Sequence, residues 1–189
     1  MQNALKILVI ASFSYTIASS AFAPLLAVFV QNIGGGVLEI SALWSVQTIT
    51  IGILIFWLAK IEDRLDQRKI LILGYFMYAV GFFSYIFIQT VAQMFITQIY
   101  LGIAAALTIP AFDAFYSKSL THGKESSEWG TWESGTRIIG AGAAVIGGVI
   151  VSQFSFNLLF VFMTVFSLIS GIILLRLLNR KEFQKLFSV

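Results

Sequence analysis

Three charged side chains stand out because long apolar stretches surround them: Asp113, Glu133 and Arg137. Glu133 precedes Arg137 by four residues, the order and spacing that favour an ion pair along one helix. Charges inside a bilayer are costly, so a functional role is the first hypothesis for such residues. A protonatable Glu133 or Asp113 would suit proton coupling. The alternative is a structural pair between Glu133 and Arg137 that only fixes helix packing.

Polar side chains in two apolar stretches could line a substrate cavity. In the first stretch they recur every three or four residues, so they would share one helix face: Ser12, Tyr15, Thr16 and Ser19. In a later stretch Gln98 and Asp113 fall along one face, and Thr108 and Phe112 flank it. The alternative is that Ser and Thr bond back to their own backbone or join helices together.

The sequence contains no residue set that suits catalysis or metal binding. It has no cysteine and one histidine, His122, which stands next to Gly123 in a polar connection. Asp113 is the one Asp expected within a span, so a catalytic Asp pair is missing. There is no phosphate-binding loop or large soluble part to hydrolyse ATP. We therefore expect no enzymatic activity, no metal and no cofactor.

The elements that must position these side chains are membrane-spanning helices. Of the 189 residues 58% are apolar, and only 21 are charged (12 Lys and Arg, 9 Asp and Glu). A hydrocarbon core of roughly 30 Å needs about 20 apolar residues in a helix. Six stretches meet this requirement: 7–31, 39–59, 70–88, 93–116, 130–152 and 157–178. We expect an all-α polytopic membrane protein with a single domain, residues 1–189.

The first stretch also has features of a secretory signal peptide. Lys6 and an apolar segment precede Ala21-Phe22-Ala23, a sequence of the Ala-x-Ala cleavage type. The apolar segment continues past this site from Leu25 to Val30, which a signal peptide does not require. We therefore expect an uncleaved first span.

Basic residues are concentrated in alternate connections. The segments 32–38, 89–92 and 153–156 contain no Lys or Arg, whereas eleven of the twelve basic residues lie in the other connections and the termini. Because cytoplasmic loops are rich in Lys and Arg, both termini are expected in the cytoplasm. The four Trp residues lie near expected span ends, which supports these boundaries. We expect the plasma membrane of a bacterium or archaeon as the location, and no nucleic acid as partner.

The connection LAKIEDRLDQRKIL, residues 58–71, holds seven charges between Lys60 and Lys69. It resembles the signature Gly-x-x-x-Asp-Arg-x-Gly-Arg-Arg/Lys between helices 2 and 3 of major facilitator superfamily transporters. The matching positions are Asp63, Arg64 and Arg68. Ala59 stands at the first Gly, and residues 66–67 depart from the signature. With its glycine-rich fifth span, the chain resembles one six-helix half of that family.

The resemblance implies a cytoplasmic charge latch. In the family an acidic residue near the cytoplasmic end of helix 4 pairs with this signature, which assigns Asp113 a partner in Arg64 or Arg68. Transporter folds are also built from inverted repeats. Pro24 and Pro110 occupy comparable places in spans 1 and 4, so we expect repeats at residues 1–89 and 90–189.

Family members generally combine two such halves, which meet through helix 2 of one half and the counterpart of helix 5 in the other. Small residues on spans 2 and 5 would suit this contact between two copies: Ser45, Gly52, Ala59, Gly140, Ala144 and Gly148. We therefore expect a homodimeric half-size secondary transporter that moves a small molecule by alternating access, with a proton as candidate coupling ion. The alternative is a non-transporting six-helix scaffold, or an accessory half that pairs with a different protein.

Overall fold

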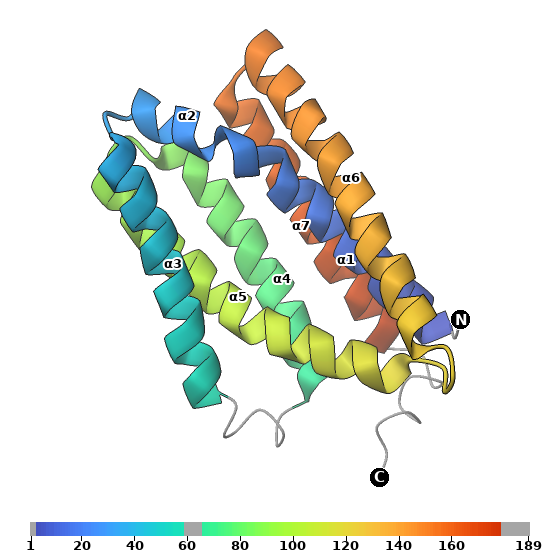
Figure 1. Cartoon of the computed structure of the whole chain (residues 1–189). Helices are drawn as coiled ribbons and strands as arrows, with labels where there is room; N and C mark the ends of the chain where they lie inside the picture. The colour runs from blue at the N-terminus through green and yellow to red at the C-terminus, as the bar shows by residue number, and fades with distance from the viewer. Residues whose placement is uncertain (1–2, 59–65, 179–189) are drawn as a thin grey trace.

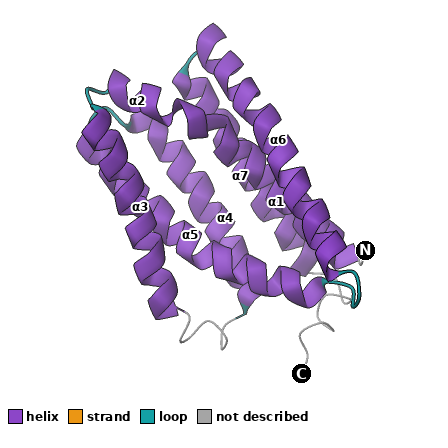
Figure 2. Ribbon diagram, viewed as in Figure 1, coloured by secondary structure: helices purple, strands orange, loops and turns teal. Residues whose placement is uncertain are grey.

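The computed structural model describes residues 3–58 and 66–178, and every regular element in these two ranges is a helix (Figure 2). In chain order the elements are α1 (Asn3–Phe22), η1 (Ala23–Leu25), α2 (Leu26–Asn32), α3 (Val37–Leu58), α4 (Gln67–Ser84), η3 (Tyr85–Phe87), α5 (Val91–Ser119), α6 (Glu125–Gln153) and α7 (Phe156–Leu178). They form six helical segments that are long and apolar enough to cross a membrane. The all-α, six-span prediction is confirmed.

The observed spans lie close to the predicted ones, with one clear extension. The short 3-10 turn η1, which contains Pro24, joins α1 and α2 into the first span, Leu5–Asn32. Helix α6 begins at Glu125, five residues before the predicted start of its span. A helix needs apolar residues only where it crosses hydrocarbon, so hydropathy alone does not detect this polar first turn.

Four helices form the packed centre, and two lie at its rims (Figure 1). Helix α7 packs against α1 and α4, and α4 also packs against α5. Helix α3 packs mainly on α5 and buries only Leu43, while α6 packs mainly on α1 and buries only Ala143 and Gly147. Most of the surface of α3 and α6 therefore faces away from the rest of the chain.

One end of the bundle carries the described basic residues at helix termini, and we call it the basic end: Lys6, Arg68, Lys69, Lys118, Lys124 and Arg176. The first turn of α1, the last turn of α7 and the α5–α6 connection lie together there (Figure 1). At the opposite end Gly34 has a φ of 87°, which suits the turn between α2 and α3. Also at that end, Thr90 and Gln93 form a capping box that starts α5.

Glycines bring pairs of helices into close contact. A Cβ atom added at Gly147 would collide with the backbone carbonyl of Ala21, so α6 meets the end of α1 almost backbone to backbone. On α4, a Cβ at Gly74 would collide with the side chain of Thr108 on α5. Because the hydrophobic effect does not drive helices together within lipid, such close packing is a main source of their association.

We predict that Gly147→Ala weakens the contact between α1 and α6. The added methyl group meets a backbone carbonyl that cannot rotate away, and overpacking of this kind costs about 1–3 kcal/mol. Gly142→Ala is the matched control, because a Cβ there meets no atom within 4 Å. Thermal unfolding in detergent should show a lower Tm for Gly147→Ala alone. Equal Tm values for the two variants would contradict this account of the contact.

Candidate functional site

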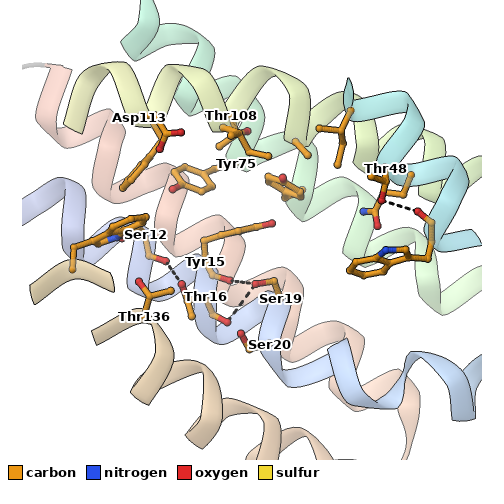
Figure 3. A pocket seen from close by; sticks show the side chains of 18 residues that line it. Ser12, Tyr15, Thr16, Ser19, Ser20, Thr48, Tyr75, Thr108, Asp113 and Thr136 are labelled. Carbon is orange, nitrogen blue, oxygen red and sulfur yellow. Dashed lines mark hydrogen bonds between the residues drawn. The ribbon is translucent and has the colours of Figure 1, made fainter. Parts of the chain in front are cut away.

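A cavity of about 510 Å³ lies between α1, α3, α4, α5 and α6 (Figure 3). Its wall contains six of the seven residues predicted from the sequence to line a cavity: Ser12, Tyr15, Thr16, Ser19, Thr108 and Phe112. The seventh, Gln98, lies in the wall of a second cavity of about 300 Å³. Both cavities share Tyr15, Ser19, Trp44, Gln47 and Tyr78, so they adjoin each other.

Five small hydroxyl groups in the wall of the larger cavity donate their protons to carbonyls of their own helices: Ser12, Thr16, Ser19, Thr48 and Thr108. Thr16 donates a hydrogen bond to the carbonyl of Ser12 at 3.0 Å, and Ser19 donates to that of Tyr15 at 3.2 Å. Thr108 donates to the carbonyl of Ala104 at 2.6 Å. The Ser and Thr residues of the stripe on α1, which are Ser12, Thr16 and Ser19, therefore bond to their own backbone and also line the cavity.

Two buried polar atoms in the cavity walls have no hydrogen-bond partner within the described part of the chain. They are Oε1 of Gln98, whose residue is 3% exposed, and Oγ1 of Thr136. Buried acceptors without partners are rare in proteins, and each suggests a bound water or ligand. The sequence placed Gln98 in the site, but Thr136 shows no distinctive pattern within the small-residue region of its span.

An aromatic cluster lies toward the basic end of the cavity, and two of its members, Phe112 and Trp132, line the wall. It consists of Phe112 and Tyr116 on α5, and Trp129 and Trp132 on α6, with ring centroids 5.0 to 5.6 Å apart. The indole Nε1 of Trp132 donates a hydrogen bond to Oγ of Ser12 at 2.9 Å, which ties the cluster to α1. The sequence predicted Trp132 as an interfacial anchor, whereas the structure places it in the cavity wall.

Three other aromatic residues belong to the same wall and were missed by the sequence analysis. Tyr75 and Tyr78 come from α4, and Trp44 comes from α3. The ring of Tyr15 lies 4.5 Å from that of Tyr78 and 5.4 Å from that of Tyr75, measured between centroids. The spacing of Tyr75 and Tyr78 by three residues was the available signal that they share a helix face.

Among the residues that the structure describes, Asp113 is the one charged residue in the wall of the larger cavity. Asp113 is exposed, and Figure 3 shows its side chain on the same helix as Thr108. Within residues 3–58 and 66–178 its carboxylate has no hydrogen bond or ion pair. Asp113 therefore presents a single negative charge to the cavity.

The predicted charge latch is described only in part. Asp63 and Arg64 lie outside the described residues, as does Ala59 of the predicted dimer contact. Arg68 donates to both carboxylate oxygens of Asp66, at 2.8 and 2.9 Å, and Asp66 also caps the first turn of α4. This bond to the Arg68 side chain lowers the pKa of Asp66 below its ordinary value. Pairing of Asp113 with the signature stays a prediction.

The predicted pair on α6 is present. Arg137 donates two hydrogen bonds to Oε1 of Glu133, at 2.9 and 2.6 Å. The Arg137 side chain is 80% exposed and that of Glu133 is 40% exposed, and neither residue lines the larger cavity. The pair lies on the outer part of a rim helix, where nothing in the described chain covers the arginine.

The small residues predicted for a dimer contact do not all face the same way. Ser45 and Gly52 are exposed on α3, and a Cβ at Gly52 or Gly148 would meet no atom within 4 Å. Gly140 faces α1 of its own chain instead, because a Cβ there would lie 3.0 Å from Oγ of Ser20. Ala144 is half-buried between these two directions.

We predict that Gln98→Leu stabilises the ligand-free protein. The substitution removes a buried acceptor whose desolvation is not offset, which is worth about 1–3 kcal/mol. Gln47→Leu is the control, because Gln47 lines both cavities without a buried unpartnered atom. Thermal unfolding should give a higher Tm for Gln98→Leu only. A lower Tm for this variant would mean that Gln98 has a stabilising partner.

The comparisons with known proteins agree with this architecture. The profile of the Major Facilitator Superfamily matches residues 8–188. The uncharacterized MFS-type transporter YitZ of Bacillus subtilis is 23% identical over 159 residues, which cover 84% of this chain and 97% of that protein. The uncharacterized MFS-type transporter MJ1560 of Methanocaldococcus jannaschii is 22% identical over 171 residues, covering 87% of this chain but 42% of that protein. The chain belongs to the Major Facilitator Superfamily and is an integral protein of the plasma membrane.

Proposed function

We propose that this six-helix unit works as a homodimeric secondary transporter, with two copies enclosing one central path for a small molecule by alternating access. The observation that carries the proposal is the placement of the polar cavity between two exposed rim helices, α3 and α6. Each rim helix contributes residues to the cavity wall and leaves its outer face uncovered. A second copy against these rims would close the cavity laterally.

The outer face of α3 is smooth enough to receive another helix. Ser41 and Ser45 are exposed, and each donates its proton to a carbonyl four residues earlier in the same helix. Gly52 continues this face toward the basic end. Small residues whose polar groups are already satisfied allow close helix contact within lipid.

The matching face of α6 combines small residues with the ion pair. Ala144 and Gly148 lie one turn apart, and Arg137 lies two turns closer to the basic end. A charged side chain at this depth needs a partner or water. In a two-fold dimer, α3 of one copy would cover α6 of the other, and the same contact would occur twice.

The arrangement of helices supports two inverted repeats, residues 1–89 and 90–189. Exchanging α1, α3 and α4 for α5, α6 and α7 leaves the set of main helix contacts unchanged: α1 on α7 becomes α5 on α4, and α3 on α5 becomes α6 on α1. Pro24 follows the first residue of its span, Leu5, by 19 residues, and Pro110 follows Val91 by 19 residues. Such repeats are the usual basis of alternating access.

Two charge pairs would control the cycle in this proposal. Asp113 would pair with Arg64 or Arg68 when the cytoplasmic side closes, as the resemblance of residues 59–68 to the family signature implies. Glu133, which is paired with Arg137 on α6, would be the candidate group for proton coupling. The orientation with both termini in the cytoplasm follows from the basic end.

The dimer is tested by disulfide crosslinking between two differently tagged copies in native membranes. One copy carries Ser45→Cys and the other Ala144→Cys. By helical rise, Ser45 lies about 12 Å from the start of α3 and Ala144 about 14 Å from the end of α6, and both of these helix ends are at the end of the bundle opposite the basic end. We expect a crosslink between the two tags after oxidation. The chain has no native cysteine, so background is absent.

The control pair is Val80→Cys with Val165→Cys, on the exposed faces of α4 and α7. It should not crosslink, because these helices lie away from the proposed contact. If neither Ser45 nor neighbouring positions on α3 can be linked to α6 of a second copy, the homodimer is wrong. The accessory role, in which the unit pairs with a different half, would then be the function to pursue.

A further inference from the structure

Part of the wall of the larger cavity presents hydroxyl oxygens as hydrogen-bond acceptors. Five of its hydroxyl groups have their protons engaged by carbonyls of their own helices: Ser12, Thr16, Ser19, Thr48 and Thr108. A hydroxyl that donates to the backbone can still accept through its lone pairs. The Oε1 atom of Gln98 adds an acceptor without a partner in the adjoining cavity. This part of the wall can therefore receive the N–H or O–H groups of a ligand.

The charge of the wall has one sign. Asp113 contributes a carboxylate, and among the described residues, 3–58 and 66–178, no Lys or Arg lines either cavity. Arg137, on the rim helix α6, forms an ion pair with Glu133. In a site partly withdrawn from water the carboxylate attracts a cation and repels an anion strongly. A two-fold dimer would double this negative charge.

Aromatic rings provide the apolar part of the site. Phe112 and Trp132, with ring centroids 5.0 Å apart, stand in the same stretch of wall as Asp113. Tyr15, Tyr75 and Tyr78 line the centre. Aromatic faces attract positively charged groups and also pack against apolar bodies.

We propose that the substrate is an amphipathic organic cation, a protonated amine with an aromatic or aliphatic body, whose ammonium group binds Asp113. This deepens the proposed function and depends on it only for the step of transport. The acceptor-lined wall receives the N–H groups, and the aromatic rings contact the body. Binding of such a cation would also compete with the latch, because both need the same carboxylate.

The test is a binding titration with four compounds that share a phenylethyl body: 2-phenylethylammonium, its N-trimethyl derivative, 2-phenylethanol and 3-phenylpropionate. Binding to the full chain in detergent is followed by isothermal calorimetry. We expect 2-phenylethylammonium to bind at least tenfold more tightly than the alcohol, and 3-phenylpropionate to show no saturable binding. The N-trimethyl derivative should bind between the ammonium and the alcohol, because it keeps the charge and loses the N–H groups.

Asp113→Asn should weaken binding of 2-phenylethylammonium about tenfold and leave the alcohol unchanged. Glu39→Gln is the matched control: it removes one carboxylate on α3 at the opposite end, outside both cavities, and should change neither affinity. Size-exclusion profiles and thermal unfolding establish that both variants are folded.

Binding of the carboxylate as tightly as the amine would overturn the proposal, as would undiminished amine binding by Asp113→Asn. Absence of saturable amine binding by the wild-type chain would overturn it as well. These outcomes are separate from failure of the proposed function, since the Ser45–Ala144 crosslink reports the dimer without any ligand. A crosslinked dimer that binds no cation would therefore remain a transporter unit for another class of substrate.

Discussion

Lipid cannot hydrogen-bond to a polar side chain, and this constraint determines how the six spans are turned. The amide oxygen of Gln98 on α5 has no partner within the described residues and would be unsatisfied against hydrocarbon, so α5 turns this face inward, where Gln98 and Thr108 are buried. Ser41 and Ser45 of α3 can remain on the outside because the hydroxyl group of each bonds to its own helix. Polar side chains that would lack hydrogen-bond partners in lipid therefore line the cavities.

Close helix packing converts that preference into a fixed geometry. Gly147 lets α6 lie on the backbone of α1, and Gly74 lets α4 receive Thr108 of α5. These contacts bring Tyr75 and Tyr78 of α4 against Tyr15 on the polar face of α1. Each rim helix packs mainly on one neighbour, α3 on α5 and α6 on α1, so its outer face stays uncovered by its own chain.

The parts of the structure that depend on local spacing could be predicted from the sequence. Span length and hydropathy located the six helices, and the four-residue spacing of Glu133 and Arg137 predicted their bond. Helical periodicity likewise gathered six of the seven expected side chains into one cavity wall.

Features that depend on helix rotation and on contacts between distant segments could not be read from the sequence. The spacing of Gly140, Ala144 and Gly148 suggested one smooth face, but in the packed helix Gly140 faces α1 and Gly148 faces open space. The bond between Trp132 and Ser12 joins residues 120 positions apart. No local pattern distinguishes such a tryptophan from an interfacial one, since both stand near a helix end.

Alternating access is the central claim, and accessibility of one cavity residue from both sides of the membrane tests it most directly. Ser19→Cys places a single thiol where the two cavities adjoin, in a chain without native cysteine. Right-side-out and inside-out vesicles are treated with a thiol reagent that does not cross membranes. Alternating access predicts that the thiol is labelled from either side of the membrane. Labelling from one side should prevent later labelling from the other side. Labelling from one side only, at every temperature and with every ligand that binds, would contradict it.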